Sequence, residues 1–243
     1  MFRAIVVAAA LLSASAAAGA SEVRGRATVI DANTFAVNGT VVHLDGIEAP
    51  ESNQRCNMDD GIKWFCGRAA AAVLFLIVQE RDVVCRIDPA RESDDGAAMA
   101  RCSVAGKDVG GEMIRRGMAW AADAAPAGYR ALQQEAEKIK RGVYQAETER
   151  ASEFRARRWR EAKSGAPGAC PIKGNVDPFG RRIYHLPWSQ WYALTKVTEA
   201  RGERWFCSEH EAIAAGWRRA AWNFVPRLAA GDMPAGGVLE NQR

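Results

Sequence analysis

The sequence predicts an α+β fold: a five-stranded OB-type barrel with three helices, followed by a small disulfide-bonded, β-rich C-terminal module. Short β-type apolar runs occupy residues 22–47, 82–87 and 99–104, and helical patterns follow the third strand and end the region. A Gly- and Pro-containing break at 164–168 then separates these elements from an aromatic-rich segment. We therefore expect two modules joined by a linker.

Residues 1–20 have the pattern of an export signal. Arg3 precedes an apolar core from Ala4 to Leu12, and small residues lead to a cleavage site after Ala20. The alternative is an uncleaved membrane anchor, but a spanning helix needs about 20 apolar residues and this run is shorter. We expect an exported chain, periplasmic or secreted, with no membrane span after processing and with a flexible tail over residues 223–243.

The chain has six cysteines, which fits export. In the oxidising surroundings of an exported chain, an even number of cysteines predicts disulfides. For Cys85 and Cys102 the alternative is a pair of buried free thiols. The formal net charge of +4 is too small by itself to imply a polyanionic partner. The expected disulfides are Cys56–Cys66, Cys85–Cys102 and Cys170–Cys207.

A hairpin with acidic flanks is the most informative part of the chain. Asn38-Gly39 joins two apolar runs, which is the strongest short-range hairpin pattern. Oxygen-bearing side chains flank the runs, and several carboxylates at one place repel each other unless a cation lies between them. The pattern therefore predicts a hard-metal site or its remnant. The flanking residues are Asp31, Asn33, Glu48 and Glu51.

The rest of the first module alternates between helix and strand patterns. Residues 63–78 are dense in apolar and alanine residues, which predicts a helix packed on a sheet. Residues 82–87 and 99–104 predict two paired strands. Asp108 can cap a helix that runs to about Arg116, and residues 129–140 carry one apolar stripe at helical spacing.

The segments V-I-D-A-N-T-F and H-L-D-G-I-E-A-P-E resemble the staphylococcal nuclease (thermonuclease) family, whose hairpin reads roughly V-x-D-G-D-T and then R-L-x-G-I-D-x-P-E. The segments G-M-A-W, L-Q-Q-E-A and R-G-V-Y extend the resemblance over about residues 24–145. It implies a staphylococcal-nuclease-like barrel over residues 21–146. It also implies calcium-dependent hydrolysis of phosphodiester bonds in DNA or RNA.

The same resemblance implies a role for each residue of the acidic cluster. Glu51 takes the position of the family's catalytic glutamate. Glu48 and Asn33 take the positions of two calcium-binding aspartates, and Asp31 that of a supporting aspartate. Asparagine still offers a carbonyl oxygen, but one negative charge of the calcium (Ca²⁺) site is lost.

The family's two arginines are replaced by His43 and Ala97. Histidine offers no bidentate fork and alanine offers no donor. Since one transition-state arginine contributes about 10³–10⁵ in rate to phosphoryl transfer, we expect a degenerate centre with weak Ca²⁺ or polyanion binding, nucleic acid included. One alternative is an active calcium-dependent endonuclease, with His43 as a catalytic donor and Arg91 or Arg55 in support. A second is a purely structural binding module without metal affinity.

Residues 147–168 predict a helical basic linker. Its many arginines can contact phosphate backbones, or they can belong to a solvated helix with balancing glutamates, and we expect the solvated helix. The linker ends in the Gly- and Pro-containing break before Cys170.

Residues 169–222 predict the second module. Ser208 and Glu211 form a capping box that starts a short helix. The segments I-K-G-N, R-I-Y-H-L-P and G-E-R-W-F-C-S-E resemble the small sunset module, which follows nuclease-like domains in some bacterial exported proteins, including ones associated with succinoglycan biosynthesis. Its partner is unknown. The alternative to a Cys170–Cys207 disulfide is zinc bound by Cys170, His185, Cys207 and His210.

Overall fold

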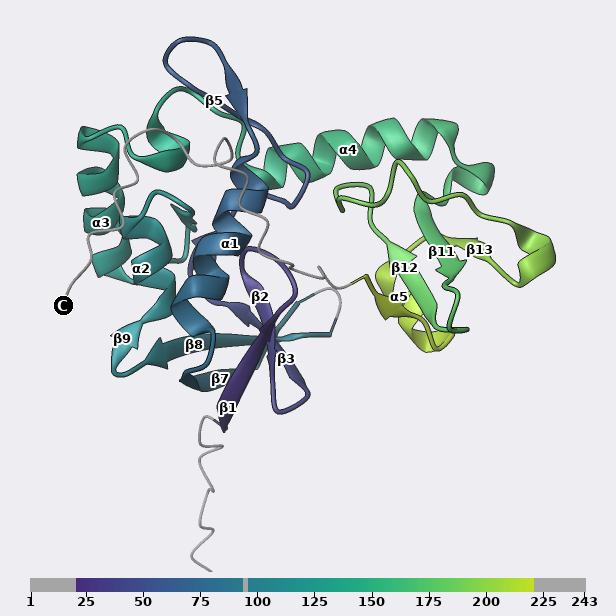
Figure 1. Cartoon of the computed structure of the whole chain (residues 1–243), viewed down its shortest axis with the longest axis horizontal. Helices are drawn as coiled ribbons and strands as arrows, with labels where there is room; N and C mark the ends of the chain where they lie inside the picture. The colour runs from purple at the N-terminus through teal and green to yellow at the C-terminus, as the bar shows by residue number, and fades with distance from the viewer. Residues whose placement is uncertain (1–20, 94–95, 221–243) are drawn as a thin grey trace, which may run out of the picture.

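In the computed structural model, which describes residues 21–93 and 96–220, a barrel and a second, smaller sheet are connected by one long helix (Figure 1). The predicted export signal at 1–20 and the predicted tail at 223–243 lie outside the described residues. No helix within the described ranges combines the length and the apolar character that a membrane crossing requires.

The barrel confirms the predicted fold class. Its sheet has the order β3-β2-β1-β7-β8-β9, and an additional parallel pairing of β3 with β8 closes it. The hairpin between β2 and β3 turns at Asn38-Gly39, as the sequence predicts. These strands are β1 (Glu22–Val29), β2 (Thr34–Val37), β3 (Thr40–Leu44), β7 (Asp82–Glu92), β8 (Ala98–Val104) and β9 (Lys107–Asp108).

Two pairs of very short strands lie beside the barrel, and the sequence did not predict them. The helix expected from Lys63 begins instead at Cys66, because Lys63 and Trp64 pair with Asn57 and Cys56. The pairs are β4 (Ile47–Glu48) with β10 (Trp120–Ala121), and β5 (Cys56–Asn57) with β6 (Lys63–Trp64).

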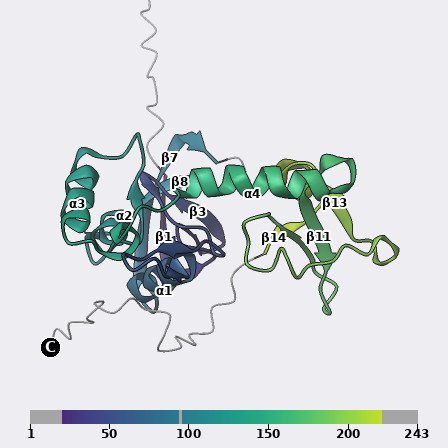
Figure 2. The same ribbon diagram turned by 90° about the horizontal axis from the view of Figure 1, so that it is seen from above.

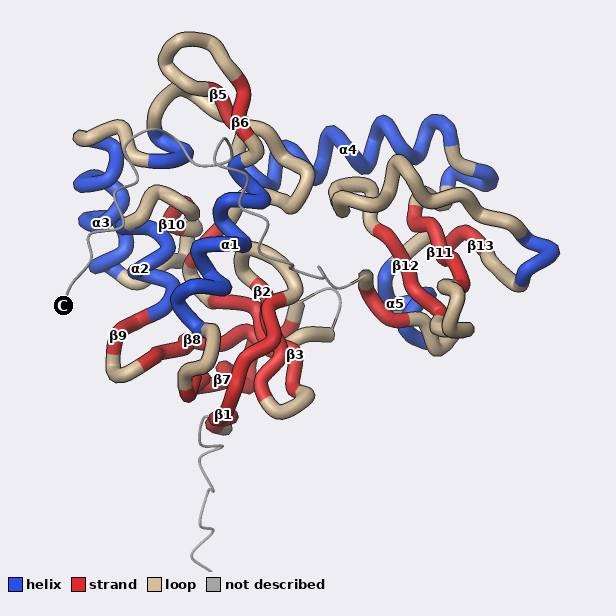
Figure 3. Tube along the Cα trace, in the orientation of Figure 1, coloured by secondary structure: helices blue, strands red, loops and turns tan. Residues whose placement is uncertain are grey.

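Three helices complete the barrel domain. Figure 3 shows α2 and α3 side by side at one end of the barrel. Asp108 Oδ1 accepts the Gly111 N–H at 2.5 Å, which is the predicted cap, and it also accepts the Tyr129 hydroxyl at 2.6 Å. The helices are α1 (Cys66–Val78), α2 (Val109–Arg115) and α3 (Ala127–Lys138), followed by the 3₁₀ turn η1 (Gly142–Tyr144).

The connecting helix α4 (Ala151–Gly165) reaches from the barrel to the second sheet in both views (Figures 1 and 2). On the far side Trp159 packs against Trp188, with ring centroids 6.1 Å apart, and Arg158 Nε donates to the Pro187 carbonyl at 3.2 Å. Most of the helix is open to solvent, with Arg157 and Arg158 paired to Glu149 and Glu161 as expected, but the helix also contacts both sheets, which the sequence analysis did not predict.

The second sheet has the strand order β13-β11-β12-β14 around its own apolar core, which includes Ile172, Tyr184 and Phe206. Ser208 Oγ accepts the Glu211 N–H, which is the predicted N-cap of α5, but the Glu211 carboxylate accepts the Cys207 N–H and not that of Ser208, so the capping box is only half formed. The elements are η2 (Pro167–Ala169), β11 (Ile172–Val176), β12 (Arg182–His185), η3 (Glu199–Arg201), β13 (Arg204–Phe206), α5 (Glu209–Ala214) and β14 (Arg218–Arg219).

The cysteines pair as the sequence analysis expected. The Cys85–Cys102 disulfide joins directly opposite positions of β7 and β8. With their sulfurs bonded to each other, Cys170 and Cys207 offer no thiolate to zinc, and His185 Nε2 lies 2.8 Å from Asn175 Oδ1. The zinc alternative is therefore wrong. The disulfides are Cys56–Cys66, Cys85–Cys102 and Cys170–Cys207.

We predict that Gly67→Ala strongly destabilises the barrel domain. A Cβ atom on Gly67 would lie 1.7 Å from the Glu51 carbonyl oxygen, so helix α1 and the loop after Pro50 would have to separate. We expect a loss of about 3 kcal/mol in the free energy of unfolding, measured by urea denaturation. Gly128→Ala is the matched control. Gly128 also lies in a helix, but no atom lies within 4 Å of a Cβ atom added there. Equal effects of the two substitutions would contradict this packing argument.

We also predict an acid-dependent loss of stability from His185. Burial, with a contribution from the Lys173 charge, lowers the pKa of His185 from 6.5 to about 4. Between about pH 6.5 and pH 4 the unfolded chain therefore binds a proton at His185 and the folded chain does not. The free energy of unfolding falls by up to about 3 kcal/mol as the pH drops through this range. Urea unfolding across this range should show a shallower pH slope for His185→Gln. An unchanged slope in His185→Gln would refute the assignment.

Candidate functional site

The acidic cluster begins at the turn before β2. Asp31 Oδ1 accepts the Asn33 N–H at 3.2 Å, and the Thr34 hydroxyl donates to Asn33 Oδ1 at 3.1 Å. Across the hairpin, His43 Nδ1 lies 2.6 Å from Thr34 Oγ1. Thr34 Oγ1 therefore lies between the Asn33 side chain and the His43 ring, and the ring tautomer sets which of the two atoms donates in the shorter contact. His43, predicted as a catalytic donor, thus orders the base of the hairpin.

Glu48, on β4, is held by the start of α4. Its carboxylate accepts two hydrogen bonds from Arg150, from Nε at 2.9 Å and Nη2 at 2.7 Å, and a third from the Ser152 N–H. Burial by itself would raise the pKa of Glu48, but the hydrogen bonds of Ser152 and Arg150 and the charge of Arg150 outweigh it, so the pKa is lowered. The carboxylate also satisfies one of the free amides at the helix N-terminus, where a negative charge is favourable.

Glu51 is more deeply enclosed. Its side chain is 11% exposed, and its carboxylate accepts a hydrogen bond from Arg155 Nη1 at 2.6 Å. Burial is the largest influence on its pKa and raises it to about 7; the Asp31 charge acts in the same direction, and Arg155 and Arg219 oppose it. A carboxyl group with this raised pKa in a cleft is a candidate for function on physical grounds.

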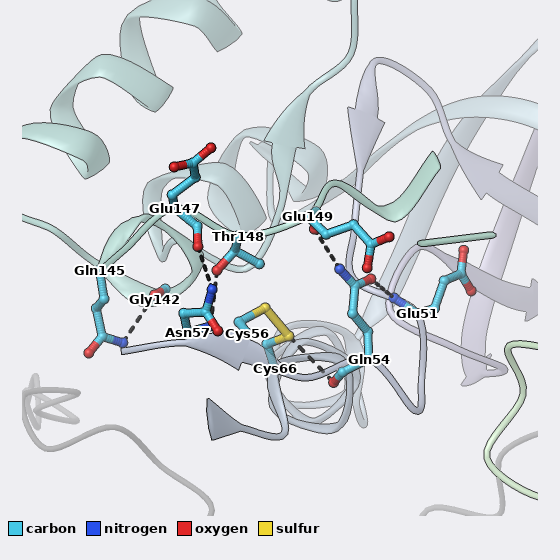
Figure 4. The surroundings of a disulfide bond; sticks show 10 residues. All are labelled: Glu51, Gln54, Cys56, Asn57, Cys66, Gly142, Gln145, Glu147, Thr148 and Glu149. Atoms are coloured by element: carbon cyan, nitrogen blue, oxygen red, sulfur yellow. Dashed lines mark hydrogen bonds between the residues drawn. A yellow bond between two sulfur atoms is a disulfide. The ribbon is translucent and has the colours of Figure 1, made fainter. Parts of the chain in front are cut away.

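Gln54 fixes the loop that carries Glu51, as Figure 4 shows. Its side-chain oxygen accepts the Glu51 N–H at 3.0 Å, and its Nε2 donates to the Glu149 carbonyl at 2.7 Å. Cys66 of the neighbouring disulfide lies 3.4 Å from the Gln54 carbonyl oxygen. The loop, the disulfide and the chain entering α4 therefore form one connected unit.

Asp31 is paired from the opposite side. Arg219, on β14 of the second sheet, places Nη2 3.3 Å from Asp31 Oδ2. Asn53 of the barrel loop donates from Nδ2 to the Ser189 carbonyl at 3.2 Å. The second sheet thus contacts the barrel at the acidic cluster itself, through residues that are far apart in the sequence.

The arginines that reach the cluster are not the ones that the sequence analysis considered. Arg91 pairs with Asp45 at 2.5 Å, and Arg55 lies over the Phe65 ring at 4.1 Å. Ala97, at the position of a missing arginine, is buried. The arginine-rich run at 150–160 was visible in the sequence, but no sequence pattern indicated which of its members face the barrel. The residues that do contact the cluster are Arg150, Arg155 and Arg219.

The residues expected to bind calcium do not fit such a site. Asn33 Oδ1 already accepts a hydroxyl hydrogen bond, and Glu48 and Asp31 each face a guanidinium group. In the described part of the chain, no three His, Cys, Asp or Glu side chains are grouped so that they can hold a metal ion. The positive charge that a cluster of carboxylates requires comes here from arginines.

Comparison with known proteins agrees with the barrel from β3 onward. A family model described as "Staphylococcal nuclease homologue" matches residues 41–146. The chain is also 33% identical over 155 residues to the succinoglycan biosynthesis protein ExoI of Rhizobium meliloti (strain 1021), covering 63% of this chain and 80% of that protein. The chain belongs to the staphylococcal nuclease homologue family. The family generally depends on calcium. This nuclease homologue departs from the family at the residues expected to bind the ion.

We predict that Arg150→Gln destabilises this nuclease homologue by about 2–4 kcal/mol, because it leaves the largely buried Glu48 carboxylate without its guanidinium partner. Arg157→Gln is the matched control in the same helix. It removes half-exposed pairs with Glu149 and Glu161 and a contact with the Phe154 ring, and it should cost clearly less than Arg150→Gln. Urea unfolding measures both. Equal losses for the two variants would show that the Arg150 pair does not hold α4 on the barrel.

Proposed function

We propose that this chain is an exported nuclease homologue with a degenerate phosphodiesterase centre, which binds a ligand and does not cleave nucleic acid. The observation that carries the proposal is the pairing of Glu48, Glu51 and Asp31 with three arginines. Hydrolysis in this family requires free charge-stabilising groups at the phosphate, and arginines engaged by carboxylates are not free.

The replacements support the same conclusion. His43 hydrogen-bonds to the hairpin, and Ala97 offers no donor. Divalent cations must compete with guanidinium groups for the carboxylates, so we expect calcium binding no tighter than about the millimolar range found for weak protein sites. The nucleic-acid binding that the family suggests is weakened in the same way, since each paired arginine is lost to phosphate.

The proposed compartment and process follow from the disulfides and from the relative. Three disulfides suit an oxidising, extracytoplasmic environment, and the predicted signal at 1–20 provides the route. Since ExoI is named for succinoglycan biosynthesis, we place this chain in envelope or exopolysaccharide biology. The second module, residues 169–222 and sunset-like by resemblance, is the part that we assign to partner binding.

We predict that the purified protein does not cleave single-stranded DNA or RNA above the buffer background, with calcium, magnesium or chelator and from pH 5 to 9. Glu51→Gln should give the same result, and this variant controls for a contaminating nuclease. Calcium titration followed by calorimetry should not saturate below about millimolar concentration. Metal-dependent cleavage that Glu51→Gln removes would overturn the proposal in favour of an active calcium-dependent endonuclease.

A further inference from the structure

A shallow cleft lies where the barrel meets the second module. Its barrel side includes Asp31 and Glu51, and its module side includes Trp188, Trp191 and Arg219. The cleft is therefore built by both parts of the molecule, and the paired carboxylates are among the groups that line it.

The module side offers an aromatic surface. Trp188 is backed by Trp159 of α4, which fixes its position, and Trp191 is 47% exposed at the cleft. A large apolar ring left open to solvent beside polar groups is typical of a binding surface.

The polar groups of the cleft suit a ligand without net charge. The Arg219 and Arg155 guanidinium groups are already paired with Asp31 and Glu51, so they are not open to the phosphates of a polyanion. Ser189 lines the cleft, and its buried Oγ has no hydrogen-bond partner among the described residues. A ligand rich in hydroxyl groups can both donate to and accept from such atoms.

We propose that this cleft binds a saccharide chain, with a sugar ring stacked on Trp191 and its hydroxyls bonded to the Asp31–Arg219 pair and Ser189. Carboxylate and guanidinium groups present two parallel hydrogen-bonding atoms, which match adjacent hydroxyls of a sugar, and an indole face packs against the C–H face of the ring. The inference rests on the proposed function, since it names the ligand of a centre that no longer cuts nucleic acid.

The test measures binding of the protein to an array of neutral and acidic oligosaccharides of defined linkage, with a single-stranded oligonucleotide included. Calorimetry on the best-bound oligosaccharide follows. We expect saturable binding to an oligosaccharide and at least a tenfold loss of affinity in Trp191→Ala. Phe179→Ala is the matched control, because Phe179 is an exposed aromatic residue of the same module at the β11–β12 turn. It should bind as the wild type does.

Three outcomes would overturn the inference: no saturable binding to any oligosaccharide, equal affinity in Trp191→Ala, or preference for the oligonucleotide. Thermal unfolding of Trp191→Ala shows whether the variant is folded. If it is not, Ser189→Ala, which removes a proposed hydrogen-bonding group of the cleft, takes its place. The nuclease assay above separates the two proposals. If the protein neither binds an oligosaccharide nor cleaves nucleic acid, only the saccharide proposal for the cleft is rejected. If it cleaves nucleic acid in a metal-dependent way, the degenerate centre is rejected.

Discussion

The pairing of Glu48 with Arg150 and with the first turn of α4 is the interaction on which the arrangement of this molecule depends. The Glu48 carboxylate accepts two hydrogen bonds from the Arg150 guanidinium group and one from a backbone amide in the first turn of α4. The pair is only partly exposed to solvent, so removal of either member leaves a charge that water screens poorly. Helix α4 leads into the second sheet at its other end. The Glu48–Arg150 pair therefore also helps to determine the position of the second sheet.

The carboxylates of the acidic cluster are neutralised by arginines. Carboxylates close together need positive charge nearby, which a metal ion or a set of arginines can supply. Here Arg150 and Arg155 come from α4, and Arg219 comes from β14. An arginine fixed by covalent connection to the fold is always present, whereas an ion must be bound from solution. The cluster has thus become part of the junction between two sheets.

The junction also explains why Glu51 keeps a raised pKa beside a cation. Its loop is fixed by Gln54, by the nearby disulfide and by close packing on Gly67, so the side chain cannot move toward solvent. Burial outweighs the two guanidinium groups that face it. The cleft beside it consequently combines a protonatable acid, balanced charges and two indole rings in one place.

Local sequence determined the barrel and the pairs that lie close in the chain. The Asn38-Gly39 turn, the Asp108 cap and the Ser208 cap follow from local backbone chemistry, and the structure shows each of them. The even cysteine number indicated disulfides, and the structure shows the pairing that the sequence analysis preferred. The closing β3–β8 pair brings together strands about fifty residues apart, and only the fold class indicated it.

The partners of the carboxylates were decided by tertiary structure alone. Arg150 and Glu48 are 102 residues apart, and Arg219 belongs to a different sheet from Asp31. A charged residue on a helix presents the same local pattern whether its side chain faces water or a carboxylate. Which face of α4 meets the barrel depends on packing at both ends of the helix, and that information is not contained in any short segment of the chain.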